Sequence, residues 1–100
     1  MVTEEQVYEV LKDVYDPEIP VNIVDLGLIY EVKINNDWVG IKMTLTAPGC
    51  PVSVYLAQQV RERLLTIPEV KDADVRIVWE PLWNPSMMSD EAKKLLGWGL

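Results

Sequence analysis

The residue best suited to chemistry in this sequence is Cys50, its only cysteine. It ends the run Thr44–Cys50, and a helical pattern begins directly after it. Proline is favoured at the first position of a helix, so Pro51 predicts that Cys50 is the N-cap. Unpaired N–H groups and the positive end of the helix dipole favour an anion there. A thiol in such a place has a lowered pKa, and its thiolate binds metals or attacks electrophiles.

The composition excludes several other kinds of chemistry. The sequence has no histidine, and so it lacks the commonest general base and the commonest nitrogen ligand for metals. A net charge of −7 argues against nucleic acid or an anionic membrane as the main partner. A single cysteine excludes an intramolecular disulfide framework. With no recognisable signal peptide or membrane-spanning run, the sequence predicts a cytoplasmic protein.

The first third of the chain predicts a helix and a turn. Thr3 and Gln6 have the spacing of a capping box, and an amphipathic apolar stripe follows them. The helix should end near Tyr15, because Pro17 disfavours helical geometry at the residue before it. A short helical turn is expected over residues 22–26, with Gly27 as its left-handed exit.

Two alternating strands follow, over residues 28–34 and 39–46, and Asn36–Asp37 suits the hairpin turn between them. A hairpin closed there places apolar residues opposite one another along one face. The predicted pairs are Ile34 with Val39, Val32 with Ile41, Tyr30 with Met43 and Leu28 with Leu45.

The second half predicts a helix from Pro51 to about Ile67 and a third strand over Val75–Trp79. A helical crossover makes that strand parallel to the second one. Ser89 is a suitable N-cap for a short C-terminal helix that ends near Gly97. The expected fold is one α+β domain, 1–100: a two-layer α-β-β-α-β sandwich with a three-stranded mixed sheet and a short C-terminal helix.

This topology brings several segments to the sheet edge at which Cys50 lies. The hairpin register places Gly27 beside Thr46, and it brings Asp25 toward the turn that contains Cys50. The carboxylate of Asp25 suits an oxygen ligand to iron or a proton partner for the thiol, although it could also simply cap its own turn. The residues expected to support the pocket are Thr44, Thr46, Gly49, Glu18, Trp79 and Glu80. The threonines could equally be ordinary strand residues, and Trp79 is expected to pack in the core.

Five segments in order carry a resemblance to a known family: DPEIP at 16–20, DLGLI at 25–29, MTLTAPGCP at 43–51, WEP at 79–81 and MMS at 87–89. The chain resembles the SufT/PaaD family of metal–sulfur cluster assembly factors over essentially its whole length. The resemblance implies a small cytosolic factor that helps iron–sulfur proteins to mature. It implies that Cys50 is the functional thiol and that Asp25 shares its pocket.

The resemblance also implies partners, namely iron–sulfur client proteins and other cluster-assembly factors. Some relatives work with a P-loop ATPase of the Mrp type. The sequence contains no G-x-x-x-x-G-K-[ST] run, so it predicts no nucleotide cofactor of its own, and a partner would supply any nucleotide chemistry.

The number of ligands limits how an iron–sulfur cluster could be held. Two- and four-iron clusters generally need four ligands, usually thiolates, and Cys50 provides one. The other ligands would come from a second copy in a homodimer, from glutathione or from a client. A transient cluster or iron ion bound through Cys50 suits a carrier, but a protein that never binds a cluster would have the same residues.

Three classes of function remain open. The first is a cluster carrier or client-targeting adapter, which is a non-catalytic role. The alternative is a thiol-dependent redox enzyme using Cys50 with Thr46 near it. That chemistry needs a nearby arginine, and the three arginines are expected away from the turn. The third is RNA binding of the KH type, which the acidic charge opposes.

Overall fold

The computed structural model describes residues 2–17, 19–46 and 50–97, with the side chains of the last range described from Ser53 onward. Its elements are α1 (Glu4–Leu11), β1 (Ile29–Asn35), β2 (Trp38–Met43), α2 (Cys50–Leu64), β3 (Asp72–Ile77), a 3-10 turn (Pro85–Met87) and α3 (Asp90–Leu96). The sheet has the order β1-β2-β3, with β1 antiparallel and β3 parallel to β2. The predicted α+β fold with a mixed three-stranded sheet is therefore confirmed.

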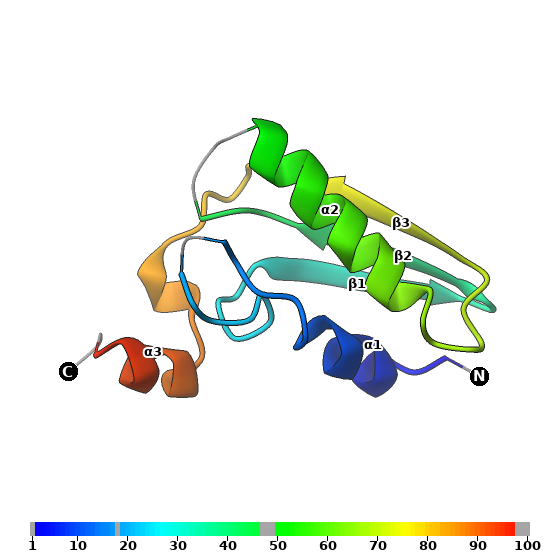
Figure 1. Cartoon of the computed structure of the whole chain (residues 1–100), viewed down its shortest axis with the longest axis horizontal. Coiled ribbons are helices and arrows are strands. Elements are labelled where there is room, and N and C mark those ends of the chain that lie inside the picture. The colour runs from blue at the N-terminus through cyan, green and yellow to red at the C-terminus, as the bar shows by residue number, and fades with distance from the viewer. Residues whose placement is uncertain (1, 18, 47–49, 98–100) are drawn as a thin grey trace.

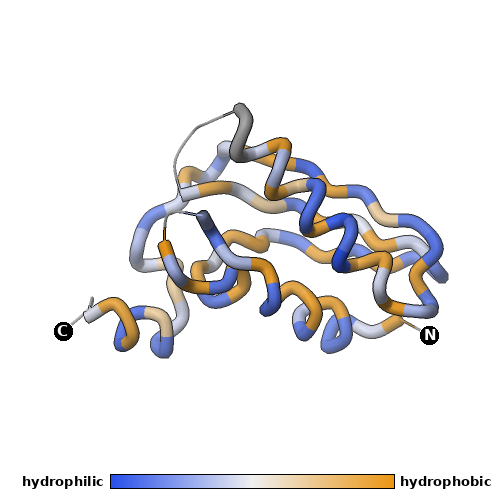
Figure 2. Tube along the Cα trace, in the orientation of Figure 1, coloured by the Kyte–Doolittle hydropathy of each residue, from blue (hydrophilic) through white to orange (hydrophobic). Residues whose placement is uncertain are grey.

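Figure 1 shows how the elements are layered. Helix α2 lies across the sheet, α1 packs beside the C-terminal half of α2, and α3 lies at the opposite end of the molecule from α1. The fully buried side chains of α2 are Leu56, Val60 and Leu64, which form its core-facing side. Figure 2 shows the resulting alternation of apolar and polar residues along α2 and the strands.

Helix α1 has the predicted start but not the predicted end. Thr3 accepts a hydrogen bond from the N–H of Gln6, and the side chain of Gln6 bonds back to the N–H of Thr3, so the capping box is confirmed. The helix ends at Leu11, and the predicted extension to Tyr15 is wrong. Backbone bonds from Ile23 N to Val14 O and from Asp16 N to Val21 O draw this segment into a loop instead.

The hairpin turns where the sequence predicted, with Asn36 at a φ of 57°. The pairs Ile34 with Val39 and Val32 with Ile41 are confirmed. Beyond them a bulge shifts the register, so that Ile29 faces Met43. The predicted pairs Tyr30 with Met43 and Leu28 with Leu45 are therefore wrong.

The bulge in β1 has a local structural role. Inserting one extra residue changes the direction in which a strand's side chains point, and here it redirects Tyr30. The hydroxyl of Tyr30 donates a hydrogen bond of 2.8 Å to the carbonyl of Pro81, in the segment after β3. The bulge thus connects the hairpin to the C-terminal part of the chain.

Strand β3 pairs with β2 residue by residue, from Asp72 opposite Trp38 to Ile77 opposite Met43. It begins before the predicted start at Val75 and ends before Trp79. The indole of Trp79 is 37% exposed, so its expected packing in the core is wrong. The last bond to β2 is from Val78 N to Met43 O, and beyond it the chain leaves the sheet.

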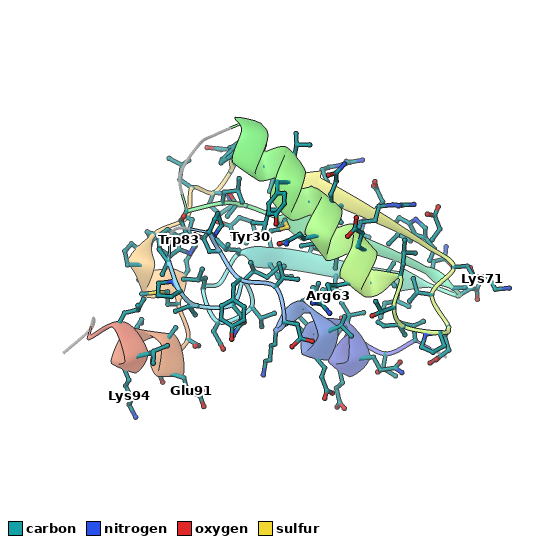
Figure 3. All side chains as sticks on the ribbon, viewed as in Figure 1. Tyr30, Arg63, Lys71, Trp83, Glu91 and Lys94 are labelled. Atoms are coloured by element: carbon teal, nitrogen blue, oxygen red, sulfur yellow. The ribbon has the colours of Figure 1, made fainter. Side chains whose placement is uncertain are left out.

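Residues 79–97 form a segment that we call the C-terminal arm, and it folds back onto the domain. The indole N–H of Trp83 donates a hydrogen bond of 2.6 Å to the carbonyl of Leu26. The backbone N–H of Ser89 donates to Asp25 O at 2.7 Å, and Ser89 also caps α3 as predicted. Met88 and Ala92 are buried. Figure 3 labels Trp83 at this end of the sheet.

Candidate functional site

Cys50 is the first residue of α2. The sequence placed it one position earlier, at the N-cap, so that detail is wrong by one residue. The shift keeps Cys50 in the first turn, where backbone N–H groups lack helical acceptors. The side chains of Cys50, Pro51 and Val52, together with Glu18 and Gly49, lie outside the described residues.

The structure brings Thr46 together with Asp16, an acid that is not among the predicted site residues. Asp16 is only 6% exposed. Its Oδ1 accepts a hydrogen bond from the N–H of Ile19 at 3.0 Å, and its Oδ2 accepts one from the hydroxyl of Thr46 at 3.3 Å. A buried carboxylate is stable only when it is well hydrogen-bonded, so these contacts hold the loop after α1 against the chain that leads to Cys50.

The sequence carried one signal for Asp16. It is an acidic residue directly after the apolar stripe of the first helix and before Pro17, within the DPEIP segment. Acidic residues are almost never fully buried unless they are paired. The proline accounted for the end of a helix, and nothing local to the segment indicated that the carboxylate turns inward to Thr46.

Asp25 is held within its own turn. Its Oδ2 accepts a hydrogen bond of 2.7 Å from the amide of Asn22, and its N–H donates to Asn22 Oδ1 at 2.9 Å. Its carbonyl accepts the bond from Ser89 described above. Asp25 therefore joins the 22–27 turn to the C-terminal arm. Its convergence with the thiol of Cys50 stays a prediction.

Thr44 occupies an unusual environment at the end of β2. Its side chain is 0% exposed, and its hydroxyl has no hydrogen-bond partner in the described part of the chain. Its N–H donates to Leu28 O at 2.9 Å. An unpaired buried hydroxyl costs about 1–3 kcal/mol, so it is a feature that a bound water or ligand would relieve.

The segment after β3 frames the same end of the sheet. Trp79 and Glu80 are both exposed. Tyr30 connects this segment to β1 through its bond to Pro81, and burial raises the pKa of the Tyr30 hydroxyl above its usual value of 10.0. The hydroxyl is thus a stable hydrogen-bond donor across the neutral range.

No set of three or more His, Cys, Asp or Glu side chains in the described ranges is arranged to hold a metal ion. Within those same ranges, no helix is long and apolar enough to cross a membrane.

Comparison with known proteins gives a consistent family. A family model described as iron–sulfur cluster assembly protein matches residues 4–77, which run from α1 to the end of β3. The Fe-S protein maturation auxiliary factor of Porphyromonas gingivalis is 47% identical over 96 residues, covering 95% of this chain and 91% of that protein. SufT of Staphylococcus aureus, also a Fe-S protein maturation auxiliary factor, is 46% identical, covering 84% of this chain and 97% of its own.

A longer relative and a solved structure extend the comparison. An iron–sulfur cluster carrier protein of Synechocystis is 31% identical over 80 residues, which are 80% of this chain and 23% of that protein. The crystal structure of a DUF59 domain from Bacillus anthracis superposes with a TM-score of 0.87 at 41% identity, covering 94% of this chain and 91% of the other. The chain therefore belongs to the iron–sulfur cluster assembly protein family.

Proposed function

We propose that this protein is an auxiliary factor in the maturation of iron–sulfur proteins, acting as a cluster carrier or as an adapter that brings clients to the assembly machinery. The observation that carries the proposal is the family match over residues 4–77, because that span contains Cys50 and the Asp16–Thr46 hydrogen bond. The names of the two similar full-length relatives support the same role.

Cys50 is the residue to which we assign the binding of iron or of an iron–sulfur cluster. Its place in the first turn of α2 favours a thiolate, the form in which cysteine binds iron. One thiolate leaves the shell of a cluster incomplete, so the remaining ligands would come from a client, a small thiol or a second copy of the chain. An incomplete shell suits a role in which the cluster is handed on rather than kept. We therefore propose a non-catalytic function.

The acids near this end of the sheet have separate roles in the proposal. Asp16 fixes the approach to Cys50 through Thr46. Asp25 remains the proposed oxygen ligand or proton partner, with Thr44 and Thr46 as pocket residues and with Glu18, Gly49, Trp79 and Glu80 around them. The hydroxyl of Thr44, which has no partner among the described residues, supports a pocket that is completed by something the protein binds.

The proposed partners are iron–sulfur clients, other assembly factors and a P-loop ATPase of the Mrp type. The aligned residues make up less than a quarter of the Synechocystis cluster carrier, so a unit of this kind also occurs within a larger protein. The ATPase would supply any nucleotide chemistry, because the printed sequence contains no G-x-x-x-x-G-K-[ST] run. A lone thiol with this role requires a reducing compartment, and we propose the cytoplasm.

The test is the variant Cys50→Ser in a strain that lacks the native gene. We expect the variant to fold as the parent does, because serine is compatible with the start of a helix, while the activity of an iron–sulfur dehydratase in the extract falls to that of the deletion strain. Anaerobic treatment of that extract with iron and sulfide should restore the activity, which shows that the client lacks its cluster rather than its polypeptide. Leu95→Ser, at an exposed site on α3, is the control. Full activity of the client with Cys50→Ser would rule out a role for the Cys50 thiol in maturation.

A further inference from the structure

We propose that the outer edge of β3, over Val75 and Ile77, is a docking site for an extended segment of an iron–sulfur client protein, which would add to the sheet as a fourth strand. The proposal rests on the proposed function only in the kind of partner it names. It assigns a second site that is separate from the thiol.

The direction of the backbone groups on β3 follows from its bonds to β2. The N–H of Val78 donates to Met43 O, and the N–H of Asp72 reaches Asp37 O. Because N–H and C=O groups alternate sides along a strand, Ala73, Val75 and Ile77 direct theirs away from β2. Since β3 is the last strand of the sheet, these groups lie on its outer edge.

One end of this edge is closed by side chains. The guanidinium Nε of Arg61, on α2, donates a hydrogen bond of 3.1 Å to Ala73 O. Oδ1 of Asp72 accepts the N–H of Ala73 at 2.9 Å and pairs with Arg61 at 3.2 Å. Proteins commonly protect edge strands against unwanted pairing with charged side chains of this kind.

The other end of the edge is open. In the described part of the chain, no hydrogen bond is made to the outward N–H and C=O groups of Val75 and Ile77. Edge groups left in this way can pair with an extended peptide. Because Arg61 and Asp72 occupy the outward groups of Ala73, such a peptide would be restricted to the C-terminal half of β3. Figure 1 shows this half beside the first turns of α2. A docked segment would thus lie near the helix start that contains Cys50.

A groove of about 330 Å³ runs between α2 and β3, from Arg61 and Ala73 at the closed end of the edge to Ile77 at the open end. Its apolar walls are Val54 and Ala57 on α2 and Val75 and Ile77 on β3, and Val54 is 60% exposed. Successive side chains of a strand point to opposite faces, so every second residue of a docked segment would enter the groove. The groove therefore favours an apolar residue at alternate positions.

Charge distinguishes a foreign segment from a second copy of the chain. Each copy carries a net charge of −7, so pairing two copies brings like charges together. A segment with basic residues between its apolar ones is attracted by that net charge instead. Beside the edge β3 carries one charge of each sign, Asp74 and Arg76, so this attraction comes from the charge of the whole chain and not from a local acidic patch. We therefore commit to an apolar and basic extended segment of a client as the occupant.

The peptide experiment uses the full chain labelled with ¹⁵N and an alternating valine–lysine decapeptide as the probe. We expect amide shifts and slowed hydrogen exchange at Val75 and Ile77. Two further decapeptides carry N-methyl groups on the valines or on the lysines. Only one set of amides faces β3 in an added strand, so one methylated peptide should lose binding and the other should keep it. Equal binding by both, or shifts confined to α1, would overturn the proposal.

The chain itself provides a matched pair of variants. Val75→Pro removes one outward N–H and no bond to β2, whereas Val75→Thr keeps that N–H and the β-branched shape. We expect Val75→Pro to lower the affinity for the decapeptide about tenfold and Val75→Thr to change that affinity little. Unchanged binding by a folded Val75→Pro variant would overturn the proposal. Where this variant fails to fold, the methylated peptides decide.

Two further outcomes separate this proposal from its alternatives. Cys50→Ser should bind the decapeptide as the parent does, so a failure of the thiol role leaves the docking site standing. Conversely, loss of edge binding would leave the thiol role intact. If the parent sediments as a dimer that Val75→Pro dissociates, the occupant is a second copy and the client proposal is overturned.

Discussion

The hydroxyl of Thr46 donates a hydrogen bond of 3.3 Å to Oδ2 of Asp16, a carboxylate that is only 6% exposed. Thr46 lies four residues before Cys50, and Asp16 lies in the loop after α1. The bond therefore joins two segments that are thirty residues apart in the sequence. It holds Thr46, four residues before the start of α2, against the loop after α1.

Replacing Thr46 with valine should show how much this hydrogen bond contributes to the free energy of unfolding. Valine keeps the shape of the side chain and leaves Oδ2 of Asp16 without the hydroxyl, which should lower the free energy of unfolding by about 1.5–3 kcal/mol. Urea unfolding measures the change, and Thr46→Ser, which keeps the hydroxyl, is the control. A loss equal in both variants would mean that the methyl group matters rather than the bond.

Local sequence signals predicted local structure well. The capping box at Thr3, the Asn36 turn and the cap at Ser89 each depend on residues within one turn of the chain, and all three are confirmed. The register shift in β1 lies at Tyr30, whose hydroxyl bonds to a distant partner, Pro81. The residues of the strand carry no signal for that partner, so their alternating pattern predicted the wrong register there.

The same distinction applies to the candidate site. Cys50 was identifiable because its type and its position before a helix are both visible in the sequence. The burial of Asp16 depends on Thr46 and on the path of an irregular loop, which periodicity does not encode. Trp79 was placed in the core because it continued an alternating pattern, but β3 ends at Ile77.

The start of α2 should make Cys50 a reactive thiol. Unpaired N–H groups of the first turn stabilise the thiolate, so the rate of alkylation by iodoacetamide at pH 7 should exceed that of an unstructured peptide of the same local sequence. We expect an increase of about threefold or more, because a larger thiolate fraction outweighs its lower nucleophilicity. Mass spectrometry over time measures the rate. A thiol slower than the peptide's would indicate a packing residue.

Replacing Gly27 with alanine should destabilise the packing of the C-terminal arm against the domain. Its φ is 79°, and a Cβ there would overlap the backbone carbonyl of Met87. Gly97 has a similar φ of 74°, and no atom of the described residues lies within 4 Å of a Cβ there, so Gly97→Ala is a matched control. The left-handed conformation alone should cost each variant about 1–2 kcal/mol, and Gly27→Ala should lose clearly more in urea unfolding. Equal losses of stability in the two variants would mean that the backbone at Met87 moves aside at little cost in free energy.

Tyr30 should make the docking of the arm sensitive to alkaline pH. Its hydroxyl donates to Pro81 O at 2.8 Å and lies 3.5 Å from Met87 Sδ, and burial raises its pKa above 10.0. The unfolded tyrosine ionises near pH 10, before the folded one does. The contribution of Tyr30 to stability is therefore complete below pH 10 and declines as the pH rises toward and through its folded pKa.

The variant Tyr30→Phe isolates this effect, because it lacks the ionisable hydroxyl but keeps the ring. At pH 7 we expect it to be less stable than the parent by about 1 kcal/mol, the usual value of one such hydrogen bond. Thermal unfolding at intervals from pH 8 to pH 11 should show this difference shrinking above pH 10. Titration of the lysines affects both proteins alike, so it cancels in the difference. A difference that stays constant to pH 11 would mean that the Tyr30 hydroxyl is not held in its neutral form by the fold.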